Sequence, residues 1–248
     1  MSTPYTFGDS ELARERLGLV AAAFEAPTRT LLDDVPGRFR RYVLDLGCGP
    51  GYTTALLAQK FVLAQVTGYD AAPAMLAEAR RRVPRAWFVK ADVTEPLLLP
   101  ADIVYGRLLL GHLREPAHVL DTWAAALRPG NGILVCEEPV RYRSDDRRFA
   151  RYEEIVTDVV ARTGATLWAA TMLDATPEGC TRVLDRVVEH PVPAGDAAAM
   201  FWRNAVQWGE GIPDVPGLID EFRALEADGA TEPVTWEIRQ TIWLRTLA

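Results

Sequence analysis

The chain has 248 residues, of which 49% are hydrophobic and 25% are charged, and its net charge is −7. This length suits one α/β domain with a few additions, and such a chain can bury a core without metal or disulfide bonds. The acidic balance argues against RNA or DNA, because phosphate contacts need a basic face. We therefore expect a small-molecule substrate and no nucleic-acid partner.

The cysteines give no sign of a disulfide framework. Cys48, Cys136 and Cys180 are far apart and form no Cys-x-x-Cys pair, which predicts free thiols in a reducing compartment. With only three histidines in addition, we expect no metal site. The N-terminus lacks the apolar core of a signal peptide, and no run approaches the ~18 apolar residues of a membrane span. We expect a cytoplasmic protein with no membrane contact.

Short apolar runs alternate with helical patterns from about residue 41 to residue 139. Buried strands are predicted at residues 42–46, 65–69, 87–89, 102–105 and 133–136. Helices are predicted between them at residues 53–61, 73–82 and 116–127. This order is typical of βαβ units, which build a doubly wound α/β fold around a parallel sheet.

The flanking segments complete this picture. Residues 10–32 are predicted to be helical with a break around Pro27, and residues 149–163 form another helix. Residues 181–189 and 234–247 alternate as strands and are expected to pair antiparallel, which gives a mostly parallel seven-stranded sheet. Amphipathic helices are predicted at residues 196–209 and 217–227. We expect a single domain, 1–248, in which residues 38–140 bind the cofactor, residues 1–37 form an N-terminal helical cap and residues 190–232 cover the substrate.

The segment after the first predicted strand contains three glycines at alternate positions, Gly47, Gly49 and Gly51. Glycines let the backbone turn sharply and let a ligand lie against it, although a tight strand-to-helix turn needs the same residues. Their Gly-x-Gly-x-Gly spacing differs from the Gly-x-Gly-x-x-Gly of dinucleotide-binding proteins.

Two acids accompany this turn. Asp45 lies inside the strand before it, where a carboxylate would order the loop or meet a cation and would repel the pyrophosphate of NAD. Asp70 ends the second strand, where a carboxylate can accept hydrogen bonds from both hydroxyls of a ribose. Ligands of open α/β sheets bind at the carboxyl ends of the strands, and both acids are predicted to lie there.

With these residues the chain resembles the class I methyltransferases that use S-adenosylmethionine (SAM). The similarity runs from the turn at residues 45–51 to Leu-Arg-Pro-Gly at 127–130, and more loosely to the end of the chain. Where the family often has Pro-Gly-Gly before the fifth strand, this chain has Pro-Gly-Asn-Gly at residues 129–132, a turn variant. The resemblance implies a Rossmann-like fold with SAM as cofactor and S-adenosylhomocysteine (SAH) as product.

The resemblance also implies the positions that hold the cofactor. Those expected against the methionine and ribose portions of SAM are Asp45, Gly47, Gly49 and Gly51. Asp70 is expected to bind the ribose, Asp92 the adenine amino group, and Val93 to lie beside the adenine ring. The segment around Tyr5 resembles an N-terminal segment that folds over SAM.

Methyl transfer from a sulfonium depends mainly on positioning, and a base is needed only when the acceptor is protonated. His112 is the candidate base because the pKa of histidine lies nearest neutrality, with a structural histidine as the alternative. Glu138, beside Glu137, would orient a cationic or hydroxylated acceptor unless it is a solvated strand end. Arg107 would contact the cofactor or an anionic substrate, or else lie at the surface.

We expect SAM-dependent methylation of an oxygen or nitrogen atom of a small metabolite, in secondary metabolism, by a monomer or homodimer. Three aromatic residues, Phe201, Trp202 and Trp208, line a substrate pocket or belong to the core. One alternative is an enzyme of the same fold that uses SAM without methyl transfer, either a lyase that cyclises its aminobutyl chain or a SAM-assisted rearrangement. A non-catalytic SAM-binding subunit is the other.

Overall fold

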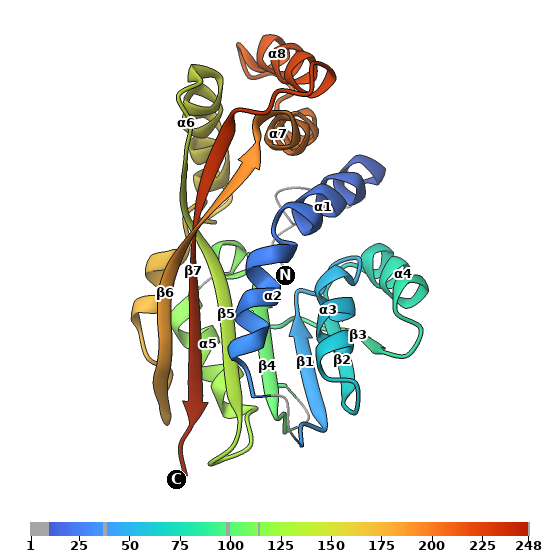
Figure 1. Ribbon diagram of the computed structural model, residues 1–248, viewed down its shortest axis with the longest axis vertical. Helices are drawn as coiled ribbons and strands as arrows, with labels where there is room; N and C mark the ends of the chain where they lie inside the picture. The colour runs from blue at the N-terminus through green and yellow to red at the C-terminus, as the bar shows by residue number, and fades with distance from the viewer. Residues whose placement is uncertain (1–9, 37–38, 98–99, 114, 248) are drawn as a thin grey trace.

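The computed structural model describes residues 10–36, 39–97, 100–113 and 115–247. Within these residues one seven-stranded sheet has the order β3-β2-β1-β4-β5-β7-β6 (Figure 1). Its strands are β1 (Tyr42–Leu46), β2 (Gln65–Asp70), β3 (Trp87–Lys90), β4 (Ile103–Arg107), β5 (Ile133–Arg143), β6 (Cys180–Pro193) and β7 (Pro233–Arg245). The first five strands pair in parallel, whereas β7 is antiparallel to both β5 and β6. The predicted mostly parallel sheet and the antiparallel pair at its edge are confirmed.

Helices cover both faces of this sheet. The helices are α1 (Glu11–Ala23), α2 (Glu25–Asp34), α3 (Tyr52–Lys60), α4 (Pro73–Arg82), α5 (Pro116–Ala125), α6 (Arg147–Arg162), α7 (Ala194–Trp208) and α8 (Val215–Ala227). Because successive strand residues point to opposite faces, Val43 packs with α2, α3 and α4, whereas its neighbour Leu44 packs with α5. The cysteines are free, as predicted.

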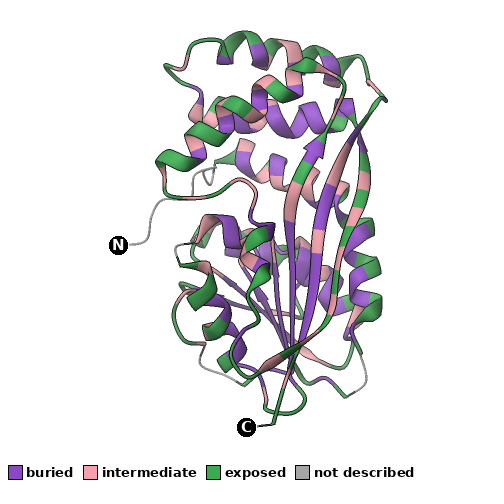
Figure 2. Cartoon of the chain, turned by 90° about the vertical axis from the view of Figure 1, so that its left-hand side faces the viewer, coloured by how far each residue is buried: buried purple, intermediate pink, exposed green. Residues whose placement is uncertain are grey.

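A helical layer lies beyond the carboxyl ends of the parallel strands. Figure 1 and Figure 2 show β5, β6 and β7 running past the other strands, with α6, α7 and α8 at the far end of this extension and α1 beside α7. These helices share an apolar cluster that includes Phe149, Tyr152, Phe201 and Phe222. The predicted helical cap is therefore present, and α6 belongs to it.

The N-terminal helical segment is divided at Phe24, three residues before the position predicted. Pro27 lies in the first turn of α2, where a backbone N–H has no partner within the helix, so proline is tolerated there. Phe24 turns inward instead, and its ring packs edge-on against Trp236 at 5.2 Å between centroids. The helix α2 packs on the sheet beside α3, whereas α1 joins the cap. In the part of the chain that the structure describes, no helix is long and apolar enough to cross a membrane.

Candidate active site

The turn between β1 and α3 contains three glycines, and the backbone is open at one of them. Gly47, Gly49 and Gly51 have φ values of +62°, +51° and +84°, a left-handed region that side chains disfavour. A Cβ added at Gly51 would meet Ala79 of α4 at 3.0 Å, so this glycine allows a close approach between the turn and that helix. A Cβ at Gly49 would meet no atom of the described residues within 4 Å. The face of Gly49 is thus open to a ligand.

Asp70 connects this turn to the end of β2. One of its carboxylate oxygens accepts a hydrogen bond from the N–H of Gly49 and the other from the N–H of Ala72, both at 2.8 Å. Burial raises the pKa of Asp70, and the hydrogen bonds from these N–H groups oppose that shift. Each carboxylate oxygen has a second lone pair, so Asp70 can also accept hydrogen bonds from ribose hydroxyls.

Asp45 orders the turn from within the protein. It is 1% exposed, and one of its oxygens accepts hydrogen bonds from the hydroxyls of Thr53 at 2.7 Å and Thr54 at 2.5 Å. Burial raises the pKa of Asp45 to about 6, although the two hydroxyls partly offset this effect. The carboxylate therefore fastens the first turn of α3 to β1, which is the first of the two roles predicted for it.

The next strand end supplies Asp92 and Val93. Asp92 follows β3 and is exposed. Its carboxylate accepts two hydrogen bonds from Thr94, one from the N–H at 3.0 Å and one from the side-chain hydroxyl at 2.7 Å. Val93 is buried, and its carbonyl accepts a hydrogen bond from the indole N–H of Trp123 at 2.8 Å. Because β3 pairs in parallel with β2, this segment lies at the same edge as Asp70.

These residues suit an adenosine-containing ligand without a pyrophosphate. The open turn at Gly49 and the carboxylate of Asp70 follow adjacent strands, close to the point where the strand order reverses between β1 and β4. A carboxylate at that place accepts ribose hydroxyls and repels phosphate. Among the residues with described positions, no group of three or more His, Cys, Asp or Glu could hold a metal ion.

A buried hydrogen-bond network surrounds Glu137 in the middle of β5, beside the end of β4. Its carboxylate accepts hydrogen bonds from the hydroxyls of Thr28 at 2.9 Å and Tyr105 at 2.5 Å, and from the amide of Gln240 at 2.8 Å. Arg107 donates to the hydroxyl of Thr28 at 3.0 Å. The network ties α2 to β4, β5 and β7. Arg107 is partly buried, which disagrees with the alternative that it is a solvated surface residue.

Glu138 fixes the loop that follows β4. It is 1% exposed, and one of its oxygens accepts hydrogen bonds from the N–H groups of Leu109 and Leu110, both at 2.8 Å. This loop contains Leu108 with φ +53°, a strained value for leucine. The two hydrogen bonds to Glu138 stabilise this strained backbone conformation. Burial raises the pKa of Glu138 to about 7. Glu138 is thus a buried anchor rather than a solvated strand end.

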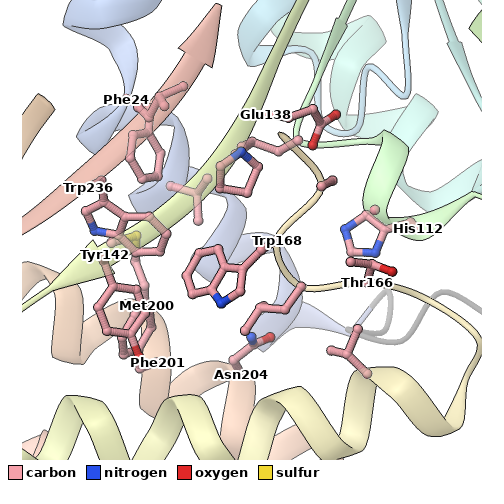
Figure 3. Close-up of a pocket in the computed structure, with 18 of the residues that line it drawn as sticks. Phe24, His112, Glu138, Tyr142, Thr166, Trp168, Met200, Phe201, Asn204 and Trp236 are labelled. Atoms are coloured by element: carbon pink, nitrogen blue, oxygen red, sulfur yellow. The ribbon is translucent and has the colours of Figure 1, made fainter. Parts of the chain in front are cut away.

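A cavity of about 130 Å³ lies between this loop and the cap. Figure 3 shows the rings of Phe24, Trp236, Tyr142 and Phe201 gathered on one side and His112 on the other, with Trp168 between them. Burial lowers the pKa of His112 to about 4, and the nearby positive charge of Arg16 adds to this shift. The imidazole is therefore neutral at physiological pH.

The structure brings together only some of the residues predicted from the sequence. His112, Glu138 and Phe201 line the cavity. Trp202 and Trp208, which the sequence assigns either to a substrate pocket or to the core, lie outside this wall. The guanidinium groups of Arg203 and Arg223 lie 4.3 Å and 4.6 Å from the ring centroid of Trp202. The ring of Trp208 packs against Tyr152. Tyr5 is outside the described residues.

Sequence reasoning missed Arg16, which lines the cavity and is 8% exposed. A signal existed, because Arg16 occupies the same helix face as Ala13 and Val20, where a charged residue interrupts an apolar stripe. It also missed Tyr142 and Trp168. These come from separate elements, and no local pattern marks them.

Comparisons with known proteins agree with this site. Residues 43–130 match the family described as "Methyltransferase domain". A trans-aconitate 2-methyltransferase of Methylobacterium radiotolerans is 34% identical over 217 residues, which cover 86% of this chain and 78% of that protein. An enzyme of the same name from Delftia acidovorans is 34% identical over 227 residues, covering 83% of this chain and 81% of its own.

Solved structures share the fold. The YcgJ protein of Bacillus subtilis has a TM-score of 0.58 at 12% identity, covering 95% of this chain and 100% of its own. Phosphoethanolamine N-methyltransferase 2 of Haemonchus contortus, solved with SAH, has a TM-score of 0.51 at 18% identity, covering 94% of this chain and 58% of its own. The chain belongs to the class I SAM-dependent methyltransferases. It is an enzyme that uses SAM to methylate a small molecule.

Proposed function

We propose that the chain transfers the methyl group of SAM to an oxygen atom of a small carboxylic acid. The observation that supports this acceptor is Arg16, a cation in the cavity wall. The other basic side chain among the described lining residues is His112, which is neutral at physiological pH. A protonated amine would be repelled there. A carboxylate is attracted, and because it is already ionised at neutral pH it needs no base.

The curated relatives support the same acceptor chemistry. Both carry the name trans-aconitate 2-methyltransferase, and trans-aconitate is a carboxylic acid. We also propose a tailoring role in secondary metabolism, which the aromatic cavity supports because it suits an apolar metabolite.

For the cofactor, we propose the residues at the carboxyl edge of the sheet. Bound SAM supplies an electrophilic methyl group on its sulfonium. The turn formed by Gly47, Gly49 and Gly51 would lie under its methionine and ribose portions, and Asp70 would accept the ribose hydroxyls. Asp92 and Val93 would hold the adenine, and the segment around Tyr5 would cover the cofactor. Asp45 would act through the turn, by holding α3 in place.

Three further residues have proposed roles that follow from their contacts. Neutral His112 would touch the acceptor as a hydrogen-bonding partner rather than remove a proton. Glu138 would position the loop that carries His112. Arg107 would position α2 through Thr28.

The proposed division of labour follows the fold. Residues 38–140 would bind SAM, while residues 1–37 and 190–232 would help to enclose the acceptor, in a monomer or homodimer. The long helix α6 adds to this enclosure, since Tyr152 and Val160 line the cavity.

The test is turnover with the purified full-length protein. SAM is offered with panels of carboxylic acids, phenols and amines, and SAH and methylated products are measured by mass spectrometry. We expect SAH to form only with acids. Methylation of amines alone would contradict the oxygen acceptor, whereas methylthioadenosine formed from SAM without an acceptor would indicate the lyase instead.

A further inference from the structure

The cavity wall offers far more ring surface than charge. Its aromatic residues, among those described, are Phe24, Tyr142, Tyr152, Trp168, Phe201 and Trp236. They come from the junction of α1 and α2, from β5, α6, α7 and β7, and from the segment after α6. Six rings from so many elements converge on one space, so this wall is more than the apolar stripe of a single helix.

Tyr142 is the centre of this wall. Its ring centroid lies 5.1 Å from that of Trp236, 5.4 Å from that of Phe201 and 5.5 Å from that of Trp168. The hydroxyl of Tyr142 donates to the carbonyl of Phe149 at 2.8 Å, and the indole N–H of Trp168 donates to Glu153 at 2.9 Å. Because the polar atoms of both side chains are already bonded within the protein, they offer a ligand mainly ring surface.

The charge of the wall is small. Besides its tyrosines, its ionisable residues within the described chain are Arg16, His112 and Glu138. With a pKa of about 4, His112 adds no charge at neutral pH, and the carboxyl of Glu138, with a pKa of about 7, repels anions to the extent that it is ionised. A carboxylate at Arg16 is attracted by the guanidinium group. A carboxylate placed elsewhere against the described wall would be buried against aromatic rings, which would cost several kcal/mol.

We infer that the acceptor is a monocarboxylic acid with an aromatic or similarly flat apolar body. Its carboxylate faces Arg16, and its body lies against Tyr142 and Trp168. This acceptor differs from trans-aconitate, which carries three carboxylates. The inference rests on the proposed function, because it concerns the acceptor of that same transfer.

The transfer balances without a base or a metal. A carboxylate oxygen of the acceptor forms a bond to the methyl carbon while the carbon–sulfur bond breaks, and the electron pair of that bond remains on sulfur. The carboxylate and the sulfonium both lose their charge, giving a neutral ester and a thioether. The ester no longer attracts Arg16, which favours release of the product.

The test compares two probes of similar size, trans-cinnamate with one carboxylate and a ring, and trans-aconitate with three carboxylates. Each is titrated by calorimetry into the full-length protein saturated with SAH. We expect trans-cinnamate to bind at least 10-fold more tightly. Equal or tighter binding of trans-aconitate would overturn the inference, and so would a failure of both probes to bind.

Matched variants locate the binding. Trp168→Leu should weaken trans-cinnamate binding at least 5-fold, whereas Trp202→Leu should leave it unchanged. The two tryptophans are comparable because each is half-buried and donates its indole N–H to a glutamate, Glu153 and Glu226 respectively, but only Trp168 lines the cavity. Equal effects of the two substitutions would refute the assignment.

The charge is tested separately. Arg16→Gln should weaken trans-cinnamate binding at least 10-fold and leave the binding of neutral cinnamamide unchanged. The control is Arg14→Gln, which removes a positive charge from the same helix at a residue that pairs with Glu78 outside the cavity. If both ligands lose affinity equally, Arg16 has only a structural role and the inference fails.

Binding and turnover distinguish this inference from the proposed function. If trans-aconitate is preferred and SAH still forms with acids, the inference is wrong and the function stands. If trans-cinnamate is preferred but no acid yields SAH, the assignment of the cavity stands and oxygen methylation is wrong.

Discussion

The substitution Gly49→Ala tests whether the open face of the glycine turn is the place of the cofactor. Gly49 has φ +51°, and an added Cβ would meet no atom within 4 Å in the part of the chain that the structure describes. Gly229, in the turn after α8, has φ +61° and the same open surroundings. In both positions alanine therefore costs only the strain of a left-handed backbone, about 1–2 kcal/mol of stability.

Binding of the cofactor should separate the two variants. If SAH lies against Gly49, the new methyl group intrudes on it, and such overpacking costs about 1–3 kcal/mol. This corresponds to roughly 5- to 150-fold weaker binding. We expect this loss for Gly49→Ala and wild-type affinity for Gly229→Ala, measured by calorimetry with SAH, alongside similar losses of stability in urea unfolding. Wild-type affinity in both variants, or the same loss in both, would refute the reasoning.

Three further substitutions test other parts of the account. Asp70→Ala should weaken SAH binding by about 1–3 kcal/mol, because ribose hydroxyls lose their acceptor; an unchanged Kd in calorimetry would contradict the ribose assignment. The pKa of Glu138 is raised from 4.5 to about 7, so its stabilising contribution is complete below pH 4.5 and is lost as the pH rises through 7. Glu138→Gln should therefore match the wild type in urea unfolding at pH 4.5 and exceed it by about 3 kcal/mol at pH 8, whereas parallel pH profiles would exclude this effect. Tyr105→Phe removes the 2.5 Å hydrogen bond to buried Glu137 and should lower the free energy of unfolding by about 1–3 kcal/mol. Its affinity for SAH should stay within 2-fold of the wild type, and a larger loss would mean that the network around Glu137 supports the cofactor site directly.

The elements with a strong local pattern could be predicted from the sequence. The strand β1, the glycine turn and Asp70 lie within one short segment, where apolar periodicity and residue spacing specify both the backbone and the site. The boundary at Phe24 could not be predicted in the same way. Pro27 indicated that the helix is interrupted nearby, but a proline is also compatible with the first turn of a helix, so it does not mark the boundary itself. The boundary lies at Phe24, whose ring packs against Trp236 from a distant part of the chain.

The acceptor cavity depends on contacts between distant parts of the chain. Arg16 of α1, Tyr142 of β5 and Trp236 of β7 meet only because the long strands carry the cap over the loop after β4. Aromatic spacing on α7 singled out Phe201, Trp202 and Trp208 alike, and only packing decides that Phe201 faces the cavity. Similarly, the hydroxyls of Thr53 and Thr54 decide that Asp45 points inward.

The most direct test of the central claim is a single turnover with methyl-deuterated SAM bound to the full-length protein and then mixed with excess trans-cinnamate. The account predicts deuterated methyl cinnamate and SAH in equal amounts, identified by mass spectrometry, and no methylthioadenosine. Intact SAM with unlabelled acid, or methylthioadenosine formed before the acid is added, would contradict it.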